Sequence, residues 1–196
     1  MTPNTHITVT LTNGISLEQA LRNAKVDVAS LVSLTVTGKF VGRDSDYIRD
    51  KMPALQGLNL SSVLNGNIEI LNKAIELNAV DIWEERLFGI YFDNCTGLKS
   101  VTLPRFITHI GSNIFEGCTG LTSIVIPDMV RQLGGWTFKG CTNLRSVTIP
   151  ASLFGIDETV FEGCIHAKFT VHTDSPYFKV KDGLLYDKEK ECFLRF

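Results

Sequence analysis

Apolar positions in the second half of the chain recur at one constant interval. The phenylalanines of four Phe-x-x-Cys segments lie 23 residues apart, at Phe92, Phe115, Phe138 and Phe161. The cysteines keep the same interval, and so do further columns of apolar residues and prolines: Leu98/Leu121/Leu144, Val101/Ile124/Val147, Leu103/Ile126/Ile149, Pro104/Pro127/Pro150, Ile107/Val130/Leu153 and Ile110/Leu133/Ile156. So many columns in phase over three copies indicate a repeat architecture.

Each repeat predicts one short strand and a return path. The segment 121–127, LTSIVIP, is rich in β-branched residues and places Ile124 and Ile126 on one face. Pro127 ends the strand because it has no N–H to donate to a neighbouring strand. The glycine before each cysteine suits a tight turn with positive φ. One 23-residue unit buries too few side chains to fold alone, so we expect stacked copies, that is, a β-dominated α/β solenoid.

The first third of the chain repeats this pattern more loosely. Segments 31–37 (LVSLTVT) and 55–61 (LQGLNLS) resemble the strand half of the repeat. Ser16 followed by Gln19 forms a capping-box pattern and predicts a helix that covers the end of the stack. A second helix is expected over 44–52, with Asp44 as its N-cap. The segment 67–83 is compatible with a helix or with one more strand over 77–83, and we favour the strand.

The pattern decays after Cys164. Ala167 replaces the leucine and Thr173 replaces the proline, and the chain then alternates around Asp182-Gly183, a strong hairpin signal. We therefore predict a β-hairpin cap at the C-terminus. The sequence stops inside a strand-like run, from which we expect the natural chain to continue. The predicted organisation is a single domain, 1–196, made of the following parts: a helical N-terminal cap (1–30), irregular repeats (31–91), regular repeats (92–166) and a C-terminal cap (167–196).

These residues resemble the BspA-like leucine-rich repeats of bacterial surface proteins. The resemblance rests on three copies of L-x-S-[VI]-x-[IL]-P, on [IL]-G-x-x-x-F-x-G-C and on the segment DGLLYDK. It is specific over 92–196 and less so over 31–61. The chain departs from the family where alanine commonly precedes the repeated phenylalanine, and where glycine is expected but Asp157 stands; the residues in the alanine column are Tyr91, Ile114, Thr137 and Val160.

The resemblance implies a leucine-rich repeat solenoid that is extracellular or attached to the cell surface. It implies binding of other macromolecules, often adhesion, without catalytic residues, and so no enzyme and no cofactor. The first residues show no signal peptide. We therefore expect either an export signal that was removed or lies outside this sequence, or an intracellular protein.

Composition narrows the class of partner. The formal net charge is −2 and the isoelectric point is about 6.1, without a run of basic residues interleaved with aromatics. This gives no electrostatic reason to expect nucleic acid. No apolar stretch approaches the roughly 20 residues of a membrane span. A protein or a glycan at a cell surface remains the expected partner.

The recurring cysteine could be a metal ligand, half of a disulfide, a nucleophile or a packing residue. Residues one repeat apart lie above one another about 4.8 Å apart, with parallel side chains. Parallel thiols do not converge into a disulfide, and a line of ligands does not make a tetrahedral zinc site. We interpret the column as inert packing, with Cys192 outside it. The four histidines share no ligand-like spacing, and no catalytic signature is present.

Binding residues are therefore sought among the positions that the core does not require. Thr102, Val125 and Thr148 are outward strand positions and predict a flat face. Aromatic and apolar residues outside the core columns predict an interface at Phe106, Met129, Trp136 and Phe154. Single exposed apolar residues, or a loop folded over them, would also explain them. The predicted function is non-enzymatic binding or adhesion; the alternatives are a spacer module of a longer surface protein and an intracellular scaffold.

Overall fold

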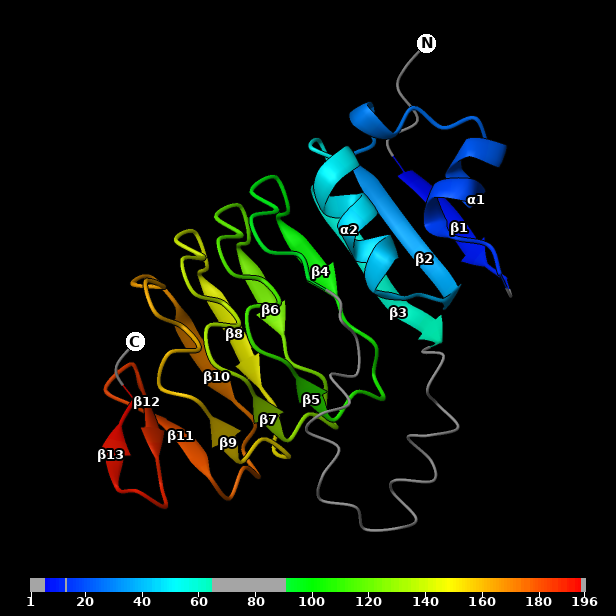
Figure 1. The fold of residues 1–196 in the computed structure, drawn as a ribbon. Coiled ribbons are helices and arrows are strands. Elements are labelled where there is room, and N and C mark those ends of the chain that lie inside the picture. Colours follow the sequence, from blue (N-terminus) through cyan, green and yellow to red (C-terminus); the bar gives the residue numbers. More distant parts are fainter. Residues whose placement is uncertain (1–5, 13, 65–90, 195–196) are drawn as a thin grey trace.

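A parallel β-sheet of seven strands runs through the molecule (Figure 1). The computed structural model describes residues 6–12, 14–64 and 91–194. Every pair of neighbouring strands in this sheet is parallel, so the chain must return to the same end of the sheet after each strand. The strands, in spatial order, are β1 (His6–Leu11), β2 (Ser33–Lys39), β3 (Gly57–Leu64), β4 (Ser100–Thr102), β6 (Ser123–Val125), β8 (Ser146–Ile149) and β10 (Lys168–Val171).

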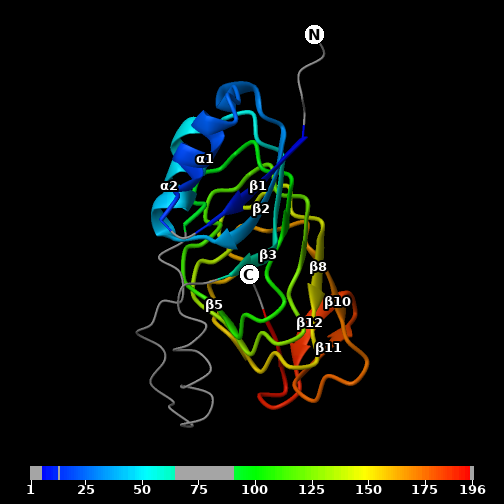
Figure 2. The same cartoon turned by 90° about the vertical axis from the view of Figure 1, so that its right-hand side faces the viewer.

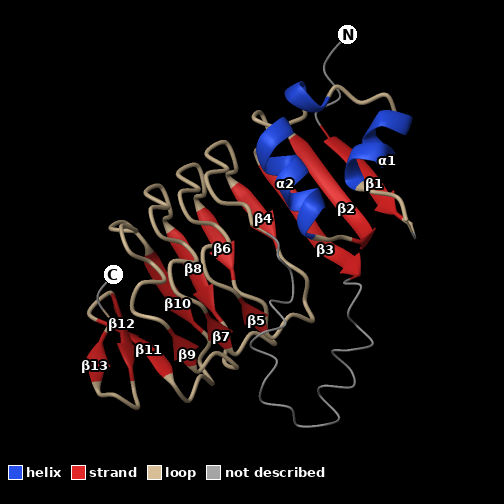
Figure 3. Ribbon diagram, viewed as in Figure 1, coloured by secondary structure: helices blue, strands red, loops and turns tan. Residues whose placement is uncertain are grey.

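Two smaller sheets accompany the main one (Figure 3). A parallel sheet of three two-residue strands lies on the return paths of the regular repeats: β5 (His109–Ile110), β7 (Gln132–Leu133) and β9 (Gly155–Ile156). An antiparallel sheet near the C-terminus contains β11 (Phe178–Lys181), β12 (Leu184–Asp187) and β13 (Cys192–Phe193).

The regular coils stack in register. Ser123 of β6 pairs with Ser100 of β4 on one side and with Ser146 of β8 on the other. The strands expected from the LTSIVIP pattern are thus present, and outward and inward positions alternate along them. The inward columns identified in the sequence are all buried in one continuous core: Leu98, Leu121, Leu144, Val101, Ile124, Val147, Leu103, Ile126, Ile149, Ile107, Val130, Leu153, Ile110, Leu133 and Ile156.

The repeated phenylalanines form one stack of rings along the solenoid. Ring centroids are 5.6 Å apart from Phe92 to Phe115, 5.5 Å from Phe115 to Phe138 and 5.3 Å from Phe138 to Phe161. The rings are almost parallel, with interplanar angles of 12°, 5° and 6°. Phe40, which the 23-residue interval did not include, continues the stack at 6.4 Å from Phe92. The irregular first third and the regular repeats therefore share one core.

The turn before each cysteine has the expected conformation. Gly117, Gly140 and Gly163 have φ of 71°, 70° and 81°, in the left-handed region that glycine adopts without a steric penalty. Asn94 occupies the same position in the first copy with φ of 58°. Asparagine is among the few other residues that tolerate this region, which explains its presence in FDNC.

The N-terminal segment contains a strand as well as the expected helix. Helix α1 (Leu17–Asn23) begins after Ser16, whose hydroxyl accepts a hydrogen bond from the Gln19 N–H at 3.2 Å. The Gln19 side chain does not complete the predicted capping box; it donates to Asn23 Oδ1 at 2.8 Å. Ahead of this helix, β1 pairs with β2 as an edge strand of the main sheet. The sequence interpretation of 1–30 as purely helical missed this strand.

The sequence predicts Asp44 as the N-cap of its helix, but in the structure Asp44 lies within the first turn. Helix α2 (Gly42–Lys51) begins after Val41, and the Asp44 Oδ2 atom accepts the Val41 N–H at 3.0 Å. The Asp44 Oδ1 atom accepts the N–H of Leu17, the first residue of α1, at 2.9 Å. The carboxylate is buried, and its burial is compensated because each oxygen accepts a hydrogen bond from the start of a helix. Both helices lie on the same side of the main sheet (Figure 2).

The C-terminal segment forms the predicted hairpin. β11 and β12 are antiparallel and are joined by Asp182 and Gly183, whose φ angles of 53° and 79° match the positive φ values of a type I′ turn. β10, although it follows the decay of the sequence pattern, still pairs in parallel with β8 and adds a seventh strand to the main sheet. Backbone pairing thus continues past the point where the consensus leucine and proline are lost. The strand or helix considered for 67–83 lies outside the described residues.

We predict that Phe138→Ala lowers the free energy of unfolding by about 3–5 kcal/mol, because it removes a fully buried ring from the middle of the stack. Trp136→Asn, two residues away, should change it by only about 1 kcal/mol. Trp136 is 44% exposed and has φ of 59°, a left-handed conformation that Asn113 adopts at the same position of the preceding coil. Urea denaturation followed by circular dichroism measures both variants. Equal losses for the two would contradict the assignment of Phe138 to the core stack.

We predict that Asp44→Ala destabilises the protein by roughly 2–3 kcal/mol, since it leaves two helix N–H groups without an acceptor. Asp46→Ala is the matched control. Asp46 lies in the same helix and forms an exposed ion pair with Arg49 at 3.0 Å, so its loss should cost at most about 1 kcal/mol. Thermal unfolding of the two variants distinguishes them, and similar melting temperatures would refute the bridging role of Asp44.

Candidate binding hollow

A hollow in the surface lies at the ends of β4 and β6, where the chain leaves the main sheet. The prolines end the strands there, and residues directly after them line the hollow together with outward strand positions. The hollow has a volume of about 600 Å³, within the range of roughly 300–1,000 Å³ typical of ligand sites. The residues that line it include Thr102, Arg105, Val125, Pro127, Asp128 and Met129.

Two of the residues that line the hollow have apolar side chains in contact with solvent. Val125 is 63% exposed and Met129 is 49% exposed. Neither belongs to an inward column, so the core does not explain them. Val125 pairs with Thr148 of β8, whose outward position holds a hydroxyl instead. Adjacent exposed apolar residues next to a concave surface are typical of an interaction site.

Two opposite charges flank these apolar residues. Arg105 and Asp128 occupy the same position of consecutive coils, directly after Pro104 and Pro127, and both are exposed. Stacked coils are about 4.8 Å apart, so a cation and an anion lie on neighbouring levels of the same wall. Within the described part of the chain, neither side chain forms a hydrogen bond or an ion pair. Both charges are available to a ligand.

The hollow gathers three of the seven predicted binding residues: Thr102, Val125 and Met129. Thr148 lies one strand further along the same face and is half-buried. Phe106 is half-buried and packs against the core, so it offers less surface than the sequence suggested. The predicted patch is therefore smaller than the set of residues proposed for it.

Phe154 and Trp136 lie away from the hollow. The Phe154 ring is 5.8 Å from that of Tyr177, in the segment before β11, although Phe154 remains 44% exposed. Trp136 follows β7 on the return path, and Lys139 Nζ lies 5.6 Å from the centroid of its indole. Neither residue lines the hollow.

Sequence reasoning missed Arg105 and Asp128. The available signal was the column they share, which reads Arg105, Asp128 and Ala151 in three successive copies. A column that changes from a cation to an anion to a methyl group is not a column of buried core residues. Such variability at a fixed position next to a strand end was compatible with a binding surface, but only the structure shows that both charges border one concavity.

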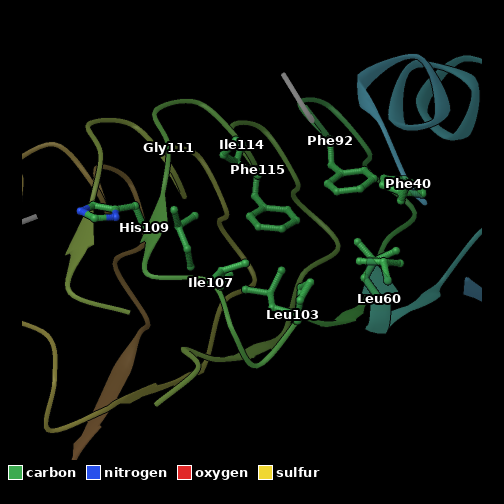
Figure 4. A pocket seen from close by; sticks show the side chains of 12 residues that line it. Phe40, Leu60, Phe92, Leu103, Ile107, His109, Gly111, Ile114 and Phe115 are labelled. Atoms are coloured by element: carbon green, nitrogen blue, oxygen red, sulfur yellow. The ribbon is translucent and has the colours of Figure 1, made fainter. Parts of the chain in front are cut away.

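An apolar cavity near the junction of β3 with the regular coils is too small to bind an organic ligand. Phe40, Phe92, Phe115 and Leu103 point into it, and His109 lies at its margin (Figure 4). Its volume of about 40 Å³ is an order of magnitude below that of a typical ligand pocket. Burial and the nearby charge of Arg131 lower the pKa of His109.

The cysteines of the column are free thiols with a structural role. Cys118, Cys141 and Cys164 are buried, and their Sγ atoms donate to the carbonyl oxygens of residues 92, 115 and 138, one coil earlier, at 2.9, 3.2 and 3.1 Å. Burial raises the pKa of Cys118 to about 12 and that of Cys95 to about 11. Thiols held in this protonated state are poor nucleophiles. Within the described ranges, no three His, Cys, Asp or Glu residues gather as metal ligands.

Comparison with known families agrees with this architecture. Residues 88–181 match the BspA type leucine-rich repeat region, in six copies. This part of the chain belongs to the BspA-type leucine-rich repeat family. The inward columns and the phenylalanine stack are thus the core of a BspA-type solenoid. No curated protein matches the chain in sequence.

Solved structures of bacterial leucine-rich repeat proteins are similar to this one. A protein from Eubacterium ventriosum covers 100% of this chain with 47% of its own, at a TM-score of 0.58 and 13% identity. A cell surface protein from Faecalibacterium prausnitzii covers 86% with 32% of its own, at 0.46 and 19%. The T. pallidum leucine-rich repeat protein covers 85% with 58% of its own, at 0.43 and 19%. The first likeness shows the fold alone, and this chain spans less than two thirds of the length of each.

No helix among the described residues is long and apolar enough to cross a membrane. The predicted boundaries of the caps and of the irregular and regular repeats stay predictions.

We predict that a thiol reagent at pH 8 modifies only the exposed Cys192 rapidly in the folded protein. Cys118, Cys141 and Cys164 should react only on unfolding, since they are buried; for Cys118, a pKa of about 12 also leaves very little thiolate at pH 8. Cys95, half-buried with a pKa of about 11, should react slowly. In denaturant without reductant, all five thiols should titrate. Fewer than five would indicate disulfides, and rapid reaction of Cys118, Cys141 and Cys164 in the folded state would contradict their burial in the core.

Proposed function

We propose that this chain is a non-enzymatic binding module of a bacterial surface protein, and that the hollow beside β4 and β6 contacts a protein partner. The observation that carries the proposal is the coincidence, in one concavity of about 600 Å³, of exposed Val125 and Met129 with the unpaired charges of Arg105 and Asp128. Membership of the BspA-type family supports the location at the cell surface. The predicted roles in adhesion and secretion are part of this proposal.

The charges favour a polypeptide over a neutral glycan. A peptide segment can present an apolar side chain between an acidic and a basic one. It would then contact Val125 and Met129 and pair with both Arg105 and Asp128. A neutral sugar would have to desolvate Arg105 and Asp128 without offering an opposite charge, which costs binding free energy. Interface cores are also enriched in methionine, and Met129 supplies an adaptable apolar contact.

The decisive experiment replaces the hollow with residues that the solenoid already uses. In the third coil, the same positions hold Ala151, Thr148 and Ser152. The variant Arg105→Ala/Val125→Thr/Asp128→Ala/Met129→Ser therefore gives these four positions the residues that the third coil already carries, keeps Phe106, and leaves every inward column intact. We predict an unchanged melting temperature and a loss of at least about tenfold in affinity for the protein that the unmodified chain selects from a panel of immobilised matrix proteins.

Glu158→Ala is the matched control, because Glu158 is exposed on a return path and outside the hollow. It should bind as the unmodified chain does. If the fourfold variant binds equally well, the hollow is not the contact surface. If the unmodified chain selects no protein from the panel and instead binds neutral glycans, the polypeptide partner is excluded. A chain that binds nothing supports a spacer module.

A further inference from the structure

The outward face of the C-terminal sheet carries two lysines over two aromatic rings. Directly paired residues of antiparallel strands share one face, and Lys179 pairs with Tyr186, which pairs with Phe193. Lys181, two residues after Lys179, lies on the same face. The opposite face carries Phe178 and Leu185, which are buried: Phe178 is 2% exposed and Leu185 is 1% exposed. The sheet thus uses one face for the core and turns the other to solvent.

The lysines are held against the rings. Lys179 Nζ lies 4.9 Å from the centroid of Tyr186, and Lys181 Nζ lies 5.3 Å from the same centroid and 5.8 Å from that of Phe193. The two rings meet edge to face, with centroids 5.2 Å apart and an interplanar angle of 80°. An ammonium group is attracted to the face of an aromatic ring, so both cations are held close to the Tyr186 ring.

Neither lysine is neutralised by the protein. Among the described residues, no carboxylate forms an ion pair with Lys179 or Lys181, although Asp182 directly follows Lys181. The neighbouring lysines differ. Lys188 donates to the Ser175 carbonyl oxygen at 2.5 Å, and Lys190 lies 3.9 Å from the Asp187 carboxylate. In a chain with a formal net charge of −2, this face is a local concentration of unpaired positive charge.

We propose that this aromatic-lysine face, formed by Lys179, Lys181, Tyr186 and Phe193, binds an anionic polysaccharide. The two ammonium groups complement carboxylate or sulfate groups, and the Tyr186 and Phe193 rings beside them offer an apolar contact to the C–H face of a sugar ring. The site is independent of the hollow beside β4 and β6 and lies on a different sheet.

The geometry favours a polysaccharide over an acidic peptide. β12 pairs with β11 on one side and with β13 on the other, so a peptide strand could be added only along the outer edges of β11 or β13 and not beside Tyr186. Recognition on this face must go through side chains that stand up from a paired sheet. A polymer with repeated anionic groups and stackable rings makes such contacts without a groove.

The test uses the full chain and four immobilised probes: heparin for sulfate groups, polygalacturonate for carboxylates, dextran as a neutral polysaccharide and polyglutamate as an acidic peptide. We expect binding to heparin and to polygalacturonate, and none to dextran. Binding should weaken as the salt concentration rises from 50 to 500 mM, because exposed charge pairs are screened. Polyglutamate, which has no sugar rings to stack, should bind at least about tenfold more weakly than polygalacturonate.

Two double variants separate the site from the overall charge. Lys179→Gln/Lys181→Gln should reduce the affinity for polygalacturonate by about tenfold or more, since it removes both ammonium groups and keeps the rings. Lys51→Gln/Lys99→Gln removes the same net charge at exposed positions elsewhere and should change it less than about twofold. Tyr186→Leu, with both lysines retained, should also weaken binding to polygalacturonate.

The proposal is overturned by any of three results. Equal losses in the two double variants would show that only the net charge matters. Polyglutamate that binds as tightly as polygalacturonate would assign the face to an acidic peptide. Absence of binding to both anionic polysaccharides would remove the site, whereas the hollow would keep its own test with matrix proteins. A changed melting temperature in Lys179→Gln/Lys181→Gln is not expected, because both side chains are exposed.

Discussion

Stacking of coils is the constraint on which the rest of the structure depends. A single coil presents a line of apolar side chains that become buried only when another coil covers them. The phenylalanine rings, 5.3 to 5.6 Å apart, and the thiols that donate to the carbonyl oxygens of the preceding coil repeat this contact at every level. Because each inward position meets its own equivalents, its size and shape are restricted. The outward positions carry no such restriction.

The two ends of the stack meet the constraint differently, because a terminal coil has a neighbour on only one side. At the N-terminal end, β1 extends the sheet and the buried carboxylate of Asp44 ties the starts of α1 and α2 together. At the C-terminal end, the antiparallel sheet buries Phe178 and Leu185 and leaves its lysines outside. This antiparallel sheet thus carries a surface that the parallel coils do not have.

The chemistry available to partners lies where the repeat is broken. Arg105, Asp128, Val125 and Met129 each differ from the residue at the same position of the third coil, and together they border one hollow. In the Phe-x-x-Cys segments, which first identify the repeat, the phenylalanine rings pack in the core and the thiols donate to backbone carbonyl oxygens. In this solenoid, regular positions build the scaffold and irregular ones differentiate its surface.

Features that depend on neighbours in sequence, or on one interval, could be predicted from the sequence. The strands of the regular coils, their inward columns, the positive φ of Gly117 and its equivalents, and the turn at Asp182-Gly183 follow from propensity and periodicity. Features that depend on contacts between distant segments could not be predicted. The pairing of β1 with β2, the placement of Phe40 on the ring stack and the second hydrogen bond of Asp44 belong to this class.

The functional surfaces divide in the same way. The sequence by itself determined that Thr102, Val125 and Met129 are outward residues of a repeat, because periodicity assigns every position to the inside or the outside. Only the tertiary structure decided that they share a concavity with Arg105 and Asp128, and that Lys179 and Lys181 stand over Tyr186. The physical reason is that a surface site is made of side chains from several coils or strands, whose spacing depends on how those elements pair and turn.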